Sequence, residues 1–148
     1  MFKKLLKGVF ALGILFMLNN PAQAFYTDMN ENHWAYQSIK FLTEVGVVVG
    51  YPDGTYKPDI PVTRAEFASM AIKALGQEDA SVTQDIHFSD VDKSFWAYDI
   101  IRKAVYFDLI PDAEGQRFRP YESVTRAEAI TIAVNALTTQ QILSLIHI

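Results

Sequence analysis

Two arginines stand at the same place in two copies of one short motif. Val-Thr-Arg-Ala-Glu occurs at 62–66 and returns unchanged at 124–128, so Arg64 and Arg126 have the same neighbours. A guanidinium group presents a planar fork of N–H donors that pairs with carboxylates and other anions. The motif places each arginine in the first turn of a helix, where the positive end of the dipole disfavours a cation. We therefore expect each arginine to have an anionic partner, either a carboxylate of the chain or an anionic ligand at the helix N-terminus. The internal alternatives are carboxylates such as Asp28 and Asp53.

The threonine and the glutamate of the same motif predict where a helix begins. A threonine at the N-cap accepts a hydrogen bond from the backbone N–H three residues on, and a glutamate there reaches back to the N–H of the cap. Apolar residues follow each motif at helical spacing and are expected to face the core. The expected caps are Thr63 with Glu66 and Thr125 with Glu128, and the expected core faces are Phe67, Met70, Ala71 and Ala74, then Ile130, Ala133, Val134 and Leu137.

Enzymatic chemistry finds little support in the remaining polar residues. The histidines His33, His87 and His147 have unrelated spacings, cysteine is absent, and neither Gly-x-Ser-x-Gly nor His-Glu-x-x-His occurs. Asp28 and Asp90 occupy equivalent places in a repeat, which favours a structural role in a turn. A glycosidase would need two carboxylates in different environments across one groove. We expect no catalysis, no cofactor and no metal site.

The region around the motif is itself repeated at an offset of 62 residues. The shift maps Asp28 onto Asp90 and the Trp-Ala-Tyr of 34–36 onto 96–98. A repeat of this length predicts structural units that stack on one another. We expect a mainly α fold made of tandem helix-loop-helix repeats. The expected divisions are a leader at 1–24, repeats at 25–76 and 88–138, a linker at 77–87, and an atypical tail at 139–148.

Within each repeat, a short extended start is expected to lead through a polar turn into a longer helix that opens at the tryptophan. The stripe of Ala35, Ile39 and Leu42 has helical spacing, and Gly46 can end this helix. The expected caps are Asn32 in the first repeat and Asp92 or Ser94 in the second.

The loop between the two helices of the first repeat contains Pro52-Asp53-Gly54. Proline presets φ and glycine accepts the left-handed conformation, so these residues predict a turn. The second loop, 111–120, has the same length, but its glycine is displaced by one position. We expect the two loops to differ in geometry.

The N-terminus reads as a secretory signal, with Lys3, Lys4 and Lys7 before the apolar stretch 9–18 and a small-x-small site at 22–24. Removing these three lysines from 13 basic residues leaves 10 against 17 acidic ones, a formal charge of −7. Such a charge argues against a nucleic-acid partner. We expect an exported protein that is cleaved after Ala24 and stabilised by an apolar core alone, since it has no cysteine.

The tail fits no position of the repeat. Its last residues, 143–148, resemble a translated adapter sequence. The alternative interpretation is the start of an ordinary linker or of a third unit. We expect the chain to be truncated there and assign no function to the tail.

These motifs resemble the S-layer homology (SLH) family. The shared features are an aromatic-x-Asp opening, Trp-Ala, a Gly-Tyr-x-Asp-Gly-Thr-aromatic-x-Pro loop at 50–58, and the Thr-Arg-Ala-Glu motif. The first repeat matches throughout, whereas the second departs in its loop. The resemblance covers about 25–138, nearly all of the chain after the leader.

The resemblance implies a non-catalytic module that holds exported proteins to the bacterial envelope. Members of the family bind cell-wall glycans, which are pyruvylated secondary polymers or peptidoglycan-linked structures. Three such motifs commonly form a pseudo-threefold helical bundle with ligand grooves between the units. This chain carries two, so a third unit and self-association are both alternatives, and a structural protein–protein module is the rival function.

The pyruvyl carboxylate suits an arginine fork, and sugar rings pack on aromatic faces. The tryptophans are either such platforms or part of the core, whereas a surface role is expected for the loop residues. The expected glycan-binding residues are Arg64, Arg126, Trp34, Trp96, Tyr51, Asp53, Gly54 and Tyr56.

Overall fold

The computed structural model describes residues 25–112 and 115–146, so the expected leader at 1–24 lies outside it. Four helices form in this part of the chain: α2 (Tyr36–Glu44), α3 (Arg64–Ala74), α4 (Tyr98–Tyr106) and α5 (Arg126–Ile146). No strand forms among these residues, and the pairing of Thr63 with Ser123 is an isolated bridge. The expectation of a mainly α fold is confirmed.

The first helix of each repeat is shorter than expected and begins after the tryptophan. α2 and α4 have nine residues each, against 11 in α3 and 21 in α5. Asn32 and Ser94 do not cap these helices, because their N–H groups donate to Asn30 and Asp92 in a preceding turn. The polar groups are engaged in hydrogen bonds within this turn. The helices therefore begin at Tyr36 and Tyr98 without a side-chain cap.

One aspartate in each repeat fastens the start of the repeat to its loop. Asp28 accepts hydrogen bonds from the backbone N–H groups of Tyr56, at 2.8 Å, and Lys57, at 2.7 Å. The equivalent Asp90 accepts the same pair from 118–119, at 2.7 and 2.8 Å. These bonds lower the pKa of Asp28, with the bond from Tyr56 as the largest cause. The start of each repeat is thus a turn that the aspartate hydrogen-bonds to the loop. The expectation of extended backbone was wrong.

The turn in the first loop forms at Pro52–Gly54. The N–H of Gly54 donates to the carbonyl of Tyr51 at 2.9 Å, and Gly54 has a φ of 80°. Gly50 is required by close approach, because a Cβ there would lie 2.1 Å from Cε1 of Tyr26. The second repeat has Asp112 in its place, which agrees with a different loop geometry.

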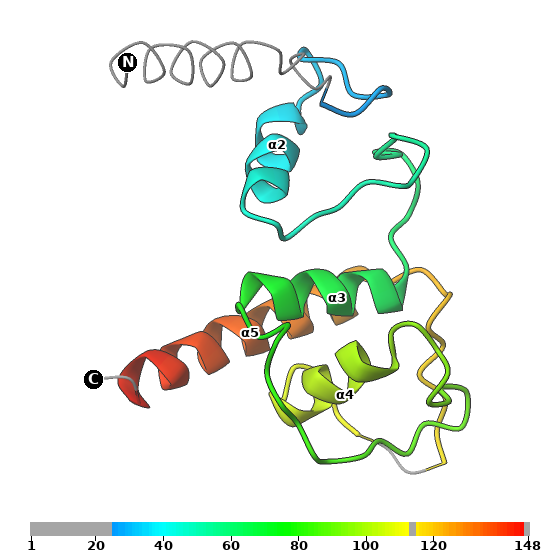
Figure 1. Cartoon of the computed structure of the whole chain (residues 1–148), viewed down its shortest axis with the longest axis vertical. Helices are drawn as coiled ribbons and strands as arrows, with labels where there is room; N and C mark the ends of the chain where they lie inside the picture. Colours follow the sequence, from blue (N-terminus) through cyan, green and yellow to red (C-terminus); the bar gives the residue numbers. More distant parts are fainter. Residues whose placement is uncertain (1–24, 113–114, 147–148) are drawn as a thin grey trace, which may run out of the picture.

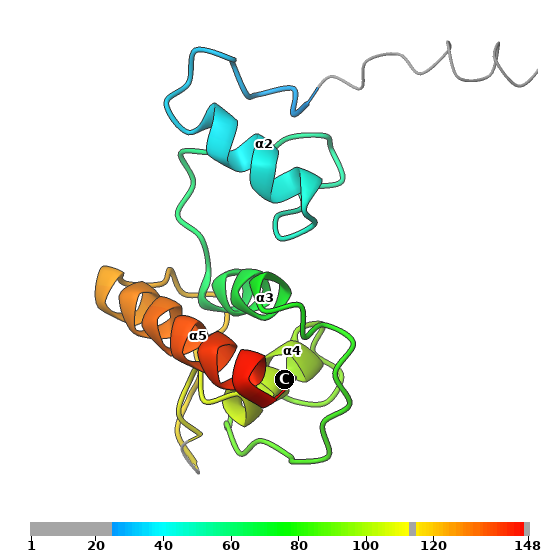
Figure 2. The same cartoon turned by 90° about the vertical axis from the view of Figure 1, so that its left-hand side faces the viewer.

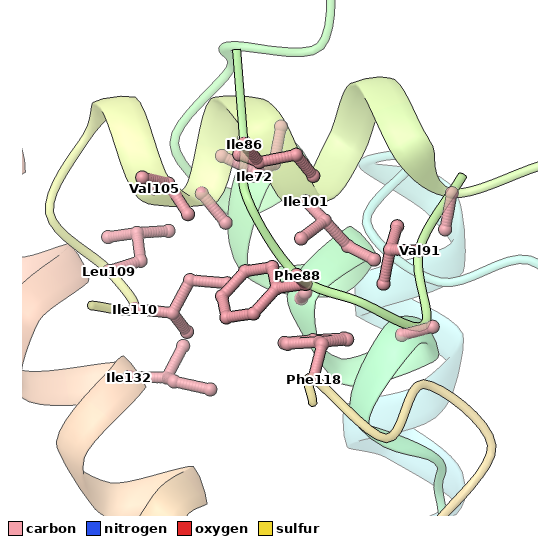
Figure 3. Packing of buried hydrophobic residues seen from close by; sticks show 14 residues of the cluster. Ile72, Ile86, Phe88, Val91, Ile101, Val105, Leu109, Ile110, Phe118 and Ile132 are labelled. Atoms are coloured by element: carbon pink, nitrogen blue, oxygen red, sulfur yellow. The ribbon is translucent and has the colours of Figure 1, made fainter. Parts of the chain in front are cut away.

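The main core lies between the repeats rather than inside either of them. α3 of the first repeat packs against α4 and α5 of the second, and Figure 3 shows Ile72 of α3 in one cluster with Ile101, Phe118 and Ile132. α2 contacts none of the other described helices and stands apart from them in both views (Figure 1, Figure 2). It packs on its own repeat through a small cluster, whose buried members are Met29, Ala35, Tyr36 and Ile39.

The helix faces that enter this core differ from those expected. In α3 the buried residues are Ala65, Ala68 and Ile72, while Phe67, Met70 and Ala71 are half-buried and Ala74 is exposed. The N–H of Ala65 donates to the carbonyl of Pro120 at 3.1 Å, which turns this face toward the second repeat. In α5 the expected face Ile130, Ala133, Val134 and Leu137 is exposed, and Ile132 is buried instead.

The tail does not form a separate segment up to residue 146. α5 continues without a break through 139–146, and the hydroxyl of Thr139 donates to the carbonyl of Phe107 at 3.0 Å. As far as the structure describes it, the tail is therefore a continuation of α5.

The capping box of α3 gives a test of the local architecture. The N–H of Glu66 donates to the Thr63 hydroxyl at 3.3 Å, and the N–H of Thr63 donates to the Glu66 carboxylate at 2.8 Å. Thr63→Ala should lower the free energy of unfolding by about 1 kcal/mol because it leaves an N–H without its acceptor. Thr63→Ser should be nearly silent. Equal effects of the two substitutions in urea melts would contradict the capping account.

Candidate functional site

Two grooves occupy equivalent positions in the two repeats. The first groove, about 480 Å³, lies between the loop 47–58, α3 and Trp96. The second groove, about 320 Å³, lies between the loop 109–119, α5 and Arg64. Eight repeat positions line both grooves, among them Lys57 and its equivalent Arg119. Each groove also takes one wall residue from the other repeat.

The first groove combines aromatic faces with cations. The hydroxyl of Tyr51 donates to the Glu66 carboxylate at 3.2 Å, which joins the loop to the capping box of α3. Burial and the neighbouring Glu66 raise the pKa of Tyr51, so it remains a neutral donor. Lys57 places its ammonium 4.0 Å from the centre of the Tyr51 ring. Lys73 and Trp96 complete the lining on the α3 side. This arrangement suits a sugar ring that carries an anionic group.

In the second groove, Arg64 serves as a junction between the repeats. Its Nε donates to the carbonyl of Phe118 at 2.6 Å, and Nη1 pairs with the carboxylate of Glu128. Its guanidinium carbon also lies 4.9 Å from the centre of the Phe118 ring. The carboxylate that Arg64 meets is therefore the capping glutamate of the next repeat, and Asp28 and Asp53 have other partners.

The backbone of the same turn extends this junction. The N–H of Arg64 donates to the carbonyl of Glu122 at 2.9 Å, and the N–H of Val124 donates to the carbonyl of Val62 at 3.0 Å. The first N–H groups of a helix have no partner inside the helix. Here the second repeat supplies acceptors for them.

The structure brings together only part of the expected glycan-binding set. Trp96, Tyr51 and Tyr56 line the first groove, and Arg64 lines the second. The other four line neither groove: Trp34, Arg126, Asp53 and Gly54. Asp53 instead accepts bonds from the N–H and the hydroxyl of Thr55, which hold the turn.

Four cations of the grooves were not anticipated, Lys57 and Lys73 in the first groove and Arg117 and Arg119 in the second. Lys57 and Arg119 occupy equivalent positions and both have positive φ, 61° and 60°. The signal in the sequence was a basic residue directly before the matched prolines, Pro58 and Pro120. Both tryptophans are exposed, Trp34 at 90% and Trp96 at 59%, so core packing does not account for either.

The described residues hold no group of three histidine, aspartate or glutamate side chains that could bind a metal ion. Over the same residues, no helix has the length and apolar character needed to cross a membrane.

Comparison with known proteins agrees with this architecture. The family model of the S-layer homology domain matches residues 25–68 and 87–130, which include both capping boxes and both loops. The chain belongs to the S-layer homology family. The two matched segments correspond to the two repeats, and the part of α5 after residue 130 lies beyond the second match.

Several surface proteins of bacteria contain similar SLH segments. The chain is 37% identical over 120 residues to cell surface glycoprotein 1 of Acetivibrio thermocellus, covering 76% of the chain and 5% of that protein. It is 34% identical over 115 residues to the cellulosome-anchoring protein of the same organism, covering 76% and 26%. A surface layer protein of Brevibacillus choshinensis is 31% identical over 103 residues, covering 68% and 9%. The chain thus spans a small part of these relatives.

The two arginines provide a matched pair for testing the junction. Arg64 is largely buried in an ion pair, whereas Arg126 is exposed and its side chain has no hydrogen bond or ion pair within the described residues. Arg64→Ala should lower the free energy of unfolding by about 2 kcal/mol, because it removes charge-assisted bonds to Phe118 and Glu128. Arg126→Ala should change it by less than about 0.5 kcal/mol. Urea melts of dilute protein measure both, and equal losses would contradict the junction role of Arg64.

The junction should also respond to acid. The N–H of Thr125, its hydroxyl and Arg64 hold the pKa of Glu128 below its usual value. A carboxyl group with a lowered folded-state pKa stabilises fully above its unfolded pKa, about 4.3, and the stability is lost as pH falls through the folded pKa. Glu128→Gln should therefore be less stable than the wild type at neutral pH, and the difference should shrink below about pH 4. A difference that stays constant across this range, measured by thermal melts, would contradict it.

Proposed function

We propose that the two SLH repeats form a non-catalytic anchoring module that holds an exported protein to the bacterial cell envelope. The observation that carries this proposal is the first groove, where Trp96 of one repeat faces Tyr51 and Lys57 of the other. Family membership and the surface proteins among the relatives support the same assignment.

The proposed ligand is an anionic cell-wall glycan, either a pyruvylated secondary polymer or a peptidoglycan-linked structure. Apolar C–H faces of the sugar would pack on Trp96 and Tyr51, and a carboxylate would pair with Lys57 or Lys73. Ammonium groups recognise an anion as point charges and tolerate several orientations of it. This suits a ligand whose carboxylates repeat along a polymer.

We further propose that the chain is exported by its leader and acts in the cell wall, the S-layer or the periplasm and outer membrane. The basic and apolar pattern of 1–24 supports export. Nucleic acid is not a proposed partner, because the mature charge is strongly negative. The module itself is proposed to use no cofactor.

Trp96 tests the glycan role directly. Trp96→Ala should weaken binding to purified cell-wall sacculi about tenfold, because stacking on an aromatic side chain is worth roughly 1–3 kcal/mol in other ligands. Tyr106→Ala is the matched control, since Tyr106 is an exposed aromatic that lines neither groove. Binding is measured by co-sedimentation, with the folded fraction of each variant checked by circular dichroism.

The same assay identifies the class of ligand. Chemical removal of linked polymers from the sacculi should abolish binding if a secondary polymer is the ligand, and should leave it intact if peptidoglycan is. Equal binding by Trp96→Ala and the wild type, with both folded, would reject the first groove as the site.

The alternative function is a structural module that binds protein, including its own copies. The exposed apolar face of α5 favours this alternative. It predicts association that depends on concentration and no affinity for sacculi.

A further inference from the structure

A strained backbone conformation occurs at one cation of each groove. Lys57 and Arg119 occupy equivalent positions in the two repeats, and their φ angles are 61° and 60°. This left-handed region is unfavourable for a residue with a long side chain. The next residue is a proline in both repeats, and a following proline favours extended backbone, which these φ angles exclude. The conformation therefore persists only because other contacts hold it.

Elsewhere in the described residues, positive φ occurs only at residue types that accept it more easily. Four of these positions are glycines, and the fifth is Asp108. Aspartate visits the left-handed region more readily than most residues. Asp108 follows α4 at the place where Gly46 follows α2, so at the helix ends the repeats use residues that suit the conformation. At the grooves, both repeats instead keep a long basic side chain where glycine would be unstrained, which indicates a role for that side chain.

The contacts that hold Lys57 in this conformation come mainly from Asp28. The Asp28 carboxylate accepts the backbone N–H of Lys57 at 2.7 Å and that of Tyr56 at 2.8 Å. The carbonyl of Lys57 accepts the N–H of Ile60 at 3.0 Å, which closes the turn after it. Because the backbone conformation sets the direction in which a side chain leaves it, Asp28 also fixes the direction of the Lys57 side chain.

The ammonium group of Lys57 lies at the first groove and is accessible there. It is 4.0 Å from the centre of the Tyr51 ring, which lines the same groove. Its ion pair with Asp53, at 3.5 Å, is exposed on both sides, at 40% and 56%. An exposed pair of this kind contributes little free energy, so the carboxylate of a ligand can replace Asp53. Asp53 then keeps the N–H of Thr55 as its donor.

Two other cations of the grooves have roles that require no ligand. Arg119 pairs with Glu122 at 3.2 Å and with Glu128 at 3.5 Å, so two carboxylates of the chain already balance its charge. Lys73 stands in the last turn of α3, where the helix dipole favours a cation. Lys57 differs from both, because its backbone is strained and its ion pair is weak.

We infer that Lys57 determines the specificity of the first groove for a carboxylate of the ligand, and that Asp28 is the residue that positions it. Asp28 acts through the backbone of Lys57 and does not contact the ligand. The inference rests on the proposed function, because it assigns charge recognition in the same groove to one of its two lysines. It adds that the chain loses stability at position 57 in order to hold this charge in place.

Substitutions at position 57 separate the strain from the charge. Lys57→Gly should melt roughly 2–5 °C higher than Lys57→Ala, because only glycine relieves the left-handed strain. At an unstrained position the order would be the reverse. Both variants should bind purified cell-wall sacculi about tenfold more weakly per folded molecule, because both lack the ammonium group. Lys57→Arg should retain most of the binding.

Lys40→Ala is the matched control for the loss of one positive charge. Lys40 is exposed on α2 and lines neither groove, so its removal should leave binding to sacculi unchanged. Binding is measured by co-sedimentation and melting by circular dichroism, so both quantities come from the same protein samples.

Asp28→Asn tests the positioning role. The amide has a single acceptor oxygen and cannot receive both N–H groups as the two carboxylate oxygens do. A merely structural role predicts a lower melting temperature, with the affinity of the folded molecules and its dependence on salt unchanged. A positioning role predicts that the folded molecules bind more weakly and that their binding depends less on salt, because the ammonium group no longer faces the ligand.

Several results would overturn the inference and leave the anchoring function intact. They are a Lys57→Gly variant that melts below Lys57→Ala, a Lys57→Gly variant that binds sacculi like the wild type, and a greater loss of binding in Lys73→Ala than in Lys57→Ala. Unchanged affinity and salt dependence in folded Asp28→Asn would overturn the role of Asp28. A wild-type chain that does not bind sacculi would instead reject the proposed function, and with it the inference.

Discussion

The structure depends on how the first turn of α3 docks onto the second repeat. Arg64 inserts its guanidinium between the carbonyl of Phe118 and the carboxylate of Glu128, and the backbone of the same turn bonds to Pro120 and Glu122. This resolves the unfavourable placement of a cation at a helix N-terminus, because the next repeat supplies the negative charge. The glutamate caps its own helix while it binds the arginine. The carboxylate of Glu128 thus takes part both in the cap of α5 and in the ion pair with Arg64 of the other repeat.

It follows that the repeat in the sequence is not the folding unit. The large core combines α3 of one repeat with α4 and α5 of the next, and α2 has only a small aromatic cluster beneath it. Stability in stacked repeats comes largely from interfaces between neighbours. A single SLH repeat taken by itself would expose Ala68 and Ile72 of α3 and lose the acceptors for its first N–H groups. Within the described residues, the two repeats provide one such interface.

Part of the local chemistry was readable in the sequence, but the caps expected at Asn32 and Ser94 do not form, and packing between the repeats was not readable at all. Residues that are near in sequence or repeated predicted several local features correctly. These are the caps at Thr63 and Thr125, the turn at Pro52–Gly54 and the turn role of Asp28. The choice of face in α3 depends on the bond from Ala65 to Pro120, which no periodicity encodes. The partner of Arg64 lies 64 residues away. Trp34 and Trp96 have the same place in the motif, but only Trp96 lies in a groove with the loop of the other repeat.

The position of the first groove links ligand binding to stacking of the repeats. Tyr51 and Lys57 come from the loop of the first repeat, while Trp96 comes from the second, so the groove has its tryptophan wall only while the repeats are docked. A ligand that binds the docked form and not the separated form stabilises the docked form by mass action. Any ligand that contacts both Trp96 and Tyr51 would therefore strengthen the contact between the repeats.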